Sequence, residues 1–283
     1  MGIVEHFAYG AITPALALAL ALLGCLLGVF IAARSRASSG GSRARWLTLS
    51  AVAIGGAGSW VPHFMALLGT DVPDSVVRYD VPITALGFGI AVVVYCLGLY
   101  VVGFGRPSLW KVLPAGTVTG LGMTAAYGTA PLAMRVAGTV GYDPATALAA
   151  VVAAVVGATV SLWCVSTVRG NKALGVAATI MAVAACSTHY AVMAAVRVDA
   201  MPSGEPISGA SPLALLTPVC VVACVLLSVL AYTTVGFSVR QNTESEEELL
   251  RRARDMYSIA TLHRAAAARH EERDRGKAAP VPQ

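Results

Sequence analysis

Histidine, methionine, cysteine and tyrosine side chains recur within three strongly apolar stretches of the sequence. These read Trp60-Val61-Pro62-His63-Phe64-Met65, Gly122-Met123-Thr124-Ala125-Ala126-Tyr127-Gly128-Thr129 and Cys186-Ser187-Thr188-His189-Tyr190-Ala191-Val192-Met193. In the third stretch Cys186, His189 and Met193 are spaced by three and four residues, which places a thiol, an imidazole and a thioether on one helix face. Because soft sulfur and nitrogen donors favour Cu(I) over harder divalent ions, this face predicts one side of a copper site.

Other side chains could complete such a site from neighbouring segments. The remaining candidate ligands are His63, the nearby Met65, and His6 just before the first apolar stretch. Candidates for gating or hydrogen-bonding roles beside them are Tyr127, Tyr190, Trp60 and Met123. A histidine in hydrocarbon is costly and is by default functional or paired, so plain interhelical hydrogen bonds remain the alternative for both histidines. For the methionines the alternative is packing, and for Tyr127 it is anchoring near the membrane interface.

The composition indicates that the elements positioning these residues lie in a membrane. Of the 283 residues 57% are hydrophobic and only 12% are charged, far from the composition of a soluble domain. The small basic surplus falls mostly in short loops between apolar stretches, which excludes a nucleic-acid-binding patch. All six cysteines lie inside apolar stretches, so a disulfide framework is not expected.

The apolar stretches predict an all-α polytopic membrane protein with seven transmembrane helices. Each stretch reaches the roughly 20 residues that a helix needs to cross the hydrocarbon. We expect the helices at 11–33, 46–69, 81–104, 112–136, 145–168, 173–197 and 213–237. The first is expected to remain as a helix, because Glu5 and His6 precede it where a cleavable signal has basic residues.

The charges of the loops predict an outer N-terminus and a cytoplasmic C-terminus. The first, third and fifth loops carry arginine and lysine without any acid, as cytoplasmic loops do. Before residue 240, all the acidic residues lie in the N-terminus and in the other three loops. We therefore divide the chain into a membrane domain at 1–240 and a cytoplasmic tail at 241–283, with a short charged helix within 244–263 and a disordered end.

These motifs resemble the MHYT family of bacterial membrane sensor domains, which is named for a Met-His-Tyr-Thr motif repeated near the outer ends of three transmembrane helices. The resemblance covers about residues 1–240. It is carried by His6-Phe7-Ala8-Tyr9-Gly10, Trp60 with His63-Phe64, Arg78-Tyr79-Asp80-Val81-Pro82, and His189-Tyr190 with Met193. It implies a sensor in the inner membrane that binds copper through His and Met and detects oxygen, carbon monoxide or nitric oxide. Family members often carry a domain that makes or hydrolyses a cyclic dinucleotide.

The chain departs from the family motif at several positions. Pro62, Ala126 and Thr188 stand where the family has methionine before histidine, and Tyr127 replaces the second histidine. The trailing methionine of the motif is present only at Met193.

Other functions of seven-helix membrane proteins require particular residues in the helices. A retinal photoreceptor needs a lysine in the last helix, and none lies between Leu213 and Phe237. Ion-coupled transport is not expected because no acidic or basic residue lies mid-helix, although Pro62 and Pro131 leave broken helices open. Haem held by His63 and His189 is the alternative cofactor.

Two functions from different classes follow from these observations. The first is a sensor without enzymatic activity that binds copper or a diatomic gas and signals through a cytoplasmic partner at 241–283. The second is a metal-handling, haem-binding or accessory membrane protein that sends no signal.

Overall fold

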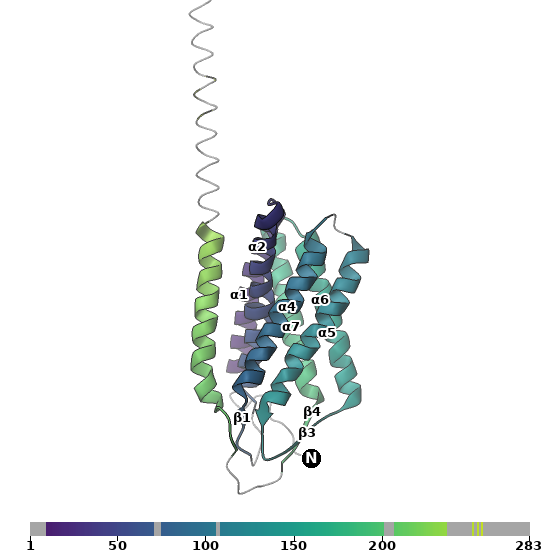
Figure 1. Ribbon diagram of the computed structural model, residues 1–283, viewed down its shortest axis with the longest axis vertical. Coiled ribbons are helices and arrows are strands. Elements are labelled where there is room, and N and C mark those ends of the chain that lie inside the picture. The colour runs from purple at the N-terminus through teal and green to yellow at the C-terminus, as the bar shows by residue number, and fades with distance from the viewer. Residues whose placement is uncertain are drawn as a thin grey trace, which may run out of the picture. The chain divides into compact units, whose positions relative to one another are not determined.

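The computed structural model describes residues 10–70, 75–105, 108–200 and 207–236, with the single residues 251, 254 and 256. Its helices are α1 (Ile12–Ser35), α2 (Gly40–Ala51), the π-helical η1 (Val52–Trp60), α3 (Val61–Leu67), α4 (Val81–Gly103), α5 (Leu109–Ala133), α6 (Pro144–Thr167), α7 (Asn171–Ala195) and a last helix, Pro212–Gly236. Four short strands connect them: β1 (Arg78–Tyr79), β2 (Met134–Arg135), β3 (Gly138–Tyr142) and β4 (Val196–Ala200). Figure 1 shows the helices as long, roughly parallel rods.

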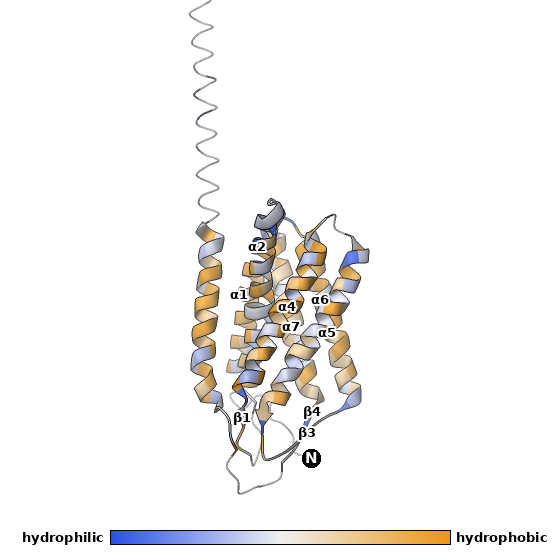
Figure 2. Cartoon of the chain, viewed as in Figure 1, coloured by the Kyte–Doolittle hydropathy of each residue, from blue (hydrophilic) through white to orange (hydrophobic). Residues whose placement is uncertain are grey.

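Within the described residues, five helices are long and apolar enough to cross a membrane: α1, α4, α6, α7 and Pro212–Gly236. In addition, α5 has 25 residues, and α2, η1 and α3 follow one another without a break. Large apolar side chains such as Trp110 and Leu148 point away from the bundle, as expected where lipid replaces water around a protein. Figure 2 shows apolar residues along the middle of the helices and hydrophilic ones at their ends.

The helices of unit Met1–Tyr232 close into a ring. Neighbours in the chain pack against each other from α4 to α7, and α1 packs against both η1 and α7. Small residues allow close approach, since a side chain at Gly24 would lie only 2.3 Å from the backbone nitrogen of Gly58. The last helix packs through Leu226 and Leu230 against α1 and the α2–η1 segment.

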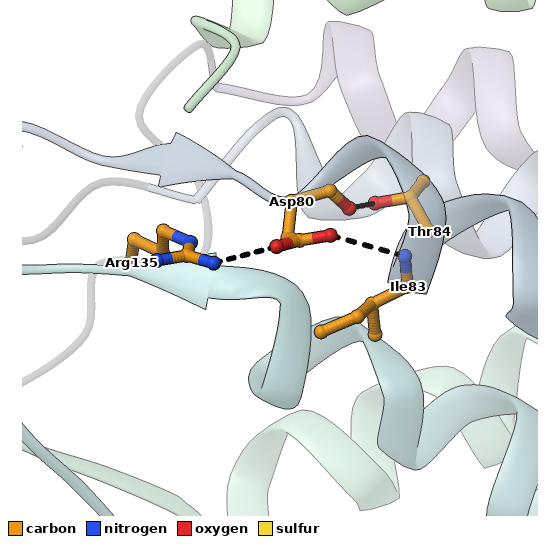
Figure 3. Close-up of polar contacts among 4 residues, drawn as sticks. All are labelled: Asp80, Ile83, Thr84 and Arg135. Atoms are coloured by element: carbon orange, nitrogen blue, oxygen red, sulfur yellow. Dashed lines mark hydrogen bonds and ion pairs between the residues drawn. The ribbon is translucent and has the colours of Figure 1, made fainter. Parts of the chain in front are cut away.

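The strands lie at one end of the bundle, which we call the strand end. There β1 pairs with β2, and β3 pairs with β4, both antiparallel. Asp80 and Asp143 follow β1 and β3 and cap α4 and α6, accepting hydrogen bonds from the backbone N–H groups of Ile83 and Thr146. Figure 3 shows the carboxylate of Asp80 between the N–H of Ile83 and the guanidinium of Arg135.

The opposite end, which we call the arginine end, holds the basic loops. Arg36 donates hydrogen bonds to the carbonyl oxygens of Val165 and Val168 at 2.6 Å and 3.2 Å, and so satisfies the last turn of α6. The partly buried position of Arg36 and the nearby Arg169 lower the pKa of its guanidinium to about 10. The charge of Arg36 therefore complements the carbonyl end of α6 at neutral pH.

Most predicted helix boundaries differ from the structure by one to six residues. The second helix begins at Gly40 rather than at 46. The fourth and sixth helices end at Ala133 and Ala195 rather than at 136 and 197, because the next residues pair as strands. The fold is predominantly α-helical as predicted, and these four short strands, which the sequence did not predict, are the exception. The predicted tail at 241–283 lies almost entirely outside the described residues.

Candidate functional site

Two histidines and a tyrosine meet inside the ring, near the strand end. His63 comes from α3, Tyr127 from α5 and His189 from α7, and no more than 3% of the surface of any of them is exposed. The Nδ1 atoms of His63 and His189 lie 2.7 Å apart, at hydrogen-bonding distance. The ring of Tyr127 stacks on that of His63, with centroids 4.1 Å apart and planes 4° apart. We call these three residues the His–Tyr cluster.

The local structure explains why His63 faces inward. It lies in the first turn of α3, directly after the π-helical stretch η1, and Pro62 occupies the start of that turn, where a missing N–H is tolerated. π-helical turns are rare and occur frequently at functional sites. The hydroxyl of Tyr127 donates a hydrogen bond of 3.3 Å to the carbonyl oxygen of Ser59, inside η1. Tyr127 therefore holds the end of η1 through its hydroxyl and packs its ring against one face of His63.

The hydrogen bond between the histidines restricts their protonation. One Nδ1 must donate and the other accept, so at most one of the two facing nitrogen atoms carries a proton. The other ring nitrogen of His63, Nε2, is buried and has no hydrogen-bond partner among the described residues. A buried nitrogen without a partner is costly, and such groups mark strain, catalytic roles or an unseen ligand or ion. His63 therefore has one nitrogen available to a ligand.

Two small cavities flank the cluster. The first is lined by His63, His189 and Cys186, with Pro62, Tyr190 and three alanines, and it gives about 10 Å³ to the centre of a water-sized molecule. That is the space needed by about one water molecule. The second lies beside Tyr127 and Met123 and is twice as large, about 20 Å³.

The structure places the remaining candidate residues around this centre. Tyr190 contacts the edge of the His189 ring at a centroid distance of 4.8 Å. Met65 and Met193 are buried, but none of the described residues lining the histidine cavity is a methionine. Trp60 stacks on Phe64 at 5.3 Å, away from the histidine pair. His6 lies outside the described residues.

Polar residues of the second cavity were missed by the sequence analysis. Ser59, Tyr95, Ser161 and Thr188 contribute hydroxyl groups to its lining. Each lies within an apolar stretch, so a search for hydroxyl groups at buried helix positions could have found them. They give the Tyr127 side of the cluster a polar environment that is buried in the bundle.

A cofactor must fit these distances. A metal bound to both Nδ1 atoms needs two bonds of about 2 Å, and hence a separation of about 3.3 Å for a tetrahedral angle or about 4 Å for a linear one, rather than 2.7 Å. Haem between the two imidazoles needs the linear separation and far more space than the adjoining cavity provides. The described residues contain no group of three or more His, Cys, Asp or Glu side chains able to hold a metal. The types of donor at this site nevertheless fit Cu(I), because His63 and Cys186 line the same small cavity.

Comparison with known proteins identifies the architecture. Residues 56–116 and residues 117–179 each match the MHYT family, described as the N-terminal repeat of bacterial signalling proteins. The segment 56–179 of this chain thus contains two MHYT repeats. The first MHYT repeat contains His63 and the second contains Tyr127, while His189 lies beyond the second match. The chain is therefore a multi-pass inner-membrane protein of the sensor type.

A curated relative carries the same kind of segment. The chain is 33% identical over 168 residues to the cyclic di-GMP phosphodiesterase NbdA of Pseudomonas aeruginosa. The match covers 57% of this chain and 21% of that protein, so the chain spans about a fifth of its relative. No solved structure matches the chain.

Proposed function

We propose that the chain is the membrane sensor of a bacterial signalling system, and that the His63–His189 pair is its responsive element. The observation that carries the proposal is the buried Nδ1–Nδ1 hydrogen bond, with the unpartnered Nε2 of His63 behind it. A ligand taken up by this pair has to compete with the hydrogen bond that joins α3 to α7. Occupancy of the site and packing of two helices are thereby linked.

The proposed ligand is Cu(I), held by His63, His189 and Cys186. A buried site with imidazole and thiol donors suits this ion because low coordination and soft ligands favour it. When bound, the ion would supply a reversible binding position for oxygen, carbon monoxide or nitric oxide. The protein itself excludes water, since both histidines and Tyr127 are buried. Tyr127 positions His63 by stacking and prevents its ring from turning toward α5.

The proposed topology has seven spans, with the strand end outside. The uninterrupted α2–η1–α3 segment and α5 would add two spans to the five that length and composition identify. Among described residues outside the helices, the arginines of the first and fifth loops lie at the arginine end, which the positive-inside rule assigns to the cytoplasm. The segment 241–283 would then contact a cytoplasmic partner, and the relative's activity suggests an enzyme of cyclic di-GMP metabolism.

A Cu(I) titration tests the site. The chain is purified in lipid nanodiscs and titrated without oxygen against a chromophoric Cu(I) chelator. The parent is expected to bind one equivalent, and His63→Ala and His189→Ala are expected to lose it, because each removes one of the proposed nitrogen ligands. His270→Ala, which removes a histidine of the tail, is the matched control and should bind as the parent does. A parent that binds no Cu(I), or histidine variants that still bind it, contradicts the proposal.

Cysteine labelling tests the topology. In intact cells a membrane-impermeant maleimide should label Asp71→Cys and leave Ser38→Cys unmodified until the membrane is opened. The parent serves as the background, because its cysteines lie in apolar stretches. The reverse labelling pattern contradicts the proposed orientation.

A further inference from the structure

A groove of about 300 Å³ runs between three helical segments, and neither histidine of the His–Tyr cluster lines it. Its walls are the η1–α3 junction, the first two turns of α4 and the first turns of the last helix. The lining residues are Trp60, Val61, Val81, Thr84, Ala85, Phe88, Leu215, Pro218, Val219 and Val222. It is thirty times larger than the histidine cavity and lies at the strand end.

The groove offers a ligand almost no polar group. Thr84 is its one hydroxyl-bearing residue among the described lining, and that hydroxyl already donates to the carbonyl oxygen of Asp80 at 2.8 Å. From Val81 to Phe88 the α4 wall extends about 10 Å along the helix axis. A second helix is about 10 Å wide with its side chains and would not enter a space of this size. The shape and chemistry fit one extended hydrocarbon chain.

Two arginines stand beside the groove where α4 begins. Arg78 and Arg135 are directly opposite each other in the β1–β2 pair, and side chains of directly opposed residues lie on the same face. Asp80, which directly precedes the groove residue Val81, accepts a 2.6 Å hydrogen bond from Arg135 (Figure 3). Two like charges at opposed positions repel, and one carboxylate cannot balance both.

The arginines retain capacity for a further anion. The side chain of Arg135 is about half exposed, and its contact with Asp80 uses one of five N–H donors. Nε of Arg78 is buried and has no hydrogen-bond partner among the described residues. Guanidinium groups bind phosphate through paired N–H donors. The mouth of the groove therefore has the chemistry that recognises a phosphate.

We propose that this groove binds one anionic phospholipid of the leaflet at the strand end. One acyl chain lies along Val81, Ala85 and Phe88, and the phosphate contacts Arg78 and Arg135. The proposal rests on the membrane location and not on copper binding. It also gives the bilayer a direct contact with the sensor, because Trp60 lines the groove, stacks on Phe64 and lies three residues before His63.

Quenching of Trp60 fluorescence by brominated lipids tests the proposal. Trp46, Trp110 and Trp163 are changed to Phe, so that Trp60 is the remaining tryptophan. The full chain is reconstituted in phosphatidylcholine vesicles with increasing fractions of phosphatidylglycerol brominated on its acyl chains, or of phosphatidylcholine brominated in the same way. Half-maximal quenching is expected at a mole fraction of phosphatidylglycerol roughly fivefold lower than that of brominated phosphatidylcholine. One net positive charge near a headgroup contributes about this factor, and Asp80 offsets the charge of one of the two arginines.

Variants separate the headgroup from the acyl chain. Arg78→Gln should remove most of the preference for phosphatidylglycerol, while Arg135→Lys, which keeps the charge, should retain it. Arg45→Gln, at the arginine end, is the matched control and should behave as the parent. Ala85→Leu, which narrows the groove, should weaken quenching by both lipids. Equal quenching by the two lipids, or no quenching in the parent because a second copy or another segment covers Trp60, would overturn the proposal.

Discussion

The first and second MHYT repeats share one architecture and differ at the residue that faces the centre of the ring. In each, an inward-facing helix is followed by a short strand, a capping aspartate and a proline-initiated helix. The backbone N–H of Asp80 donates to the carbonyl oxygen of Ala133, and that of Asp143 donates to Ala195, at 2.8 Å and 2.9 Å. Each repeat is thereby fastened to the end of the next inward-facing helix. The shared part of the repeats builds the ring.

The residue at the centre of the ring gives the two repeats different roles. The first carries His63 after a π-helical stretch, and the second carries Tyr127 within the regular helix α5. His63 is hydrogen-bonded to His189 of α7. Tyr127 instead stacks on His63 and donates a hydrogen bond to Ser59 in η1. The first repeat thus holds the group that can respond, and the second forms the rigid wall behind it. Three pairs of substitutions can break or sharpen this division.

Substitution of a glycine at equivalent positions should destabilise the second repeat more than the first. A side-chain carbon at Gly120 would lie 2.4 Å from the α-carbon of Val155 in α6. At Gly56, the equivalent position in the first repeat, the nearest atoms belong to side chains, and the closest is in the ring of Phe88 at 2.9 Å. Gly120→Ala is therefore expected to cost about 3 kcal/mol, because backbone must move, and Gly56→Ala about 1 kcal/mol. Thermal unfolding in detergent, followed by circular dichroism, measures both.

Gly128→Ala provides the control in the same helix. Nothing lies within 4 Å of a side-chain carbon at this position, so the substitution should be neutral or raise the midpoint temperature slightly. Equal losses for Gly56→Ala and Gly120→Ala would show that the two helices are packed alike and would remove this part of the comparison.

Removal of the polar groups of the cluster tests the assignment more directly. His63→Phe keeps a ring beside Tyr127 but leaves Nδ1 of His189 without its 2.7 Å partner, which we expect to cost about 2 kcal/mol of the free energy of unfolding. Tyr127→Phe keeps the stacking and removes one hydrogen bond to Ser59, for about 1 kcal/mol. Chemical unfolding in mixed micelles gives both values. A larger loss at Tyr127 than at His63 would reverse the roles given to the two repeats.

The sequence predicted the helices better than the geometry of the His–Tyr cluster. Apolar stretches of about 20 residues identify membrane helices because lipid requires internal backbone hydrogen bonding. Since His63, Tyr127 and His189 lie at similar depths in helices of the same direction, their common level followed from counting residues. Their side-chain geometry did not follow, because whether two imidazoles bind each other or an ion depends on rotamers and helix rotation.

The strands and η1 lacked a local signal. β1 and β2 have two residues each, too few for an alternating pattern, and Met134 continues an apolar stretch. Their pairing depends on two loops more than 50 residues apart in the chain. The π-helical stretch contains Gly55, Gly56 and Gly58, but glycine is also common in regular membrane helices that pack closely. A change from i→i+4 to i→i+5 hydrogen bonds is decided by contacts with α1 and α4 rather than by these residues alone.

The smallest expected difference concerns the two capping aspartates and depends on pH. The guanidinium of Arg135 and the N–H of Ile83 lower the pKa of Asp80, while the N–H and hydroxyl of Thr146 lower the pKa of Asp143. A carboxylate with a lowered pKa stabilises the fold above its unfolded pKa of about 4, and this stabilisation is lost as the pH falls through the folded value. The midpoint temperature of the parent should therefore fall below about pH 4. Asparagine keeps the capping oxygen but not the charge. Asp80→Asn should reduce this fall more than Asp143→Asn, since Arg135 donates a hydrogen bond to Asp80 and is the largest cause of its lowered pKa, whereas the charge of Arg197 is the smallest cause at Asp143. Arg135→Gln should reproduce Asp80→Asn, and identical pH profiles for both asparagine variants would show that the ion pair adds nothing to the cap.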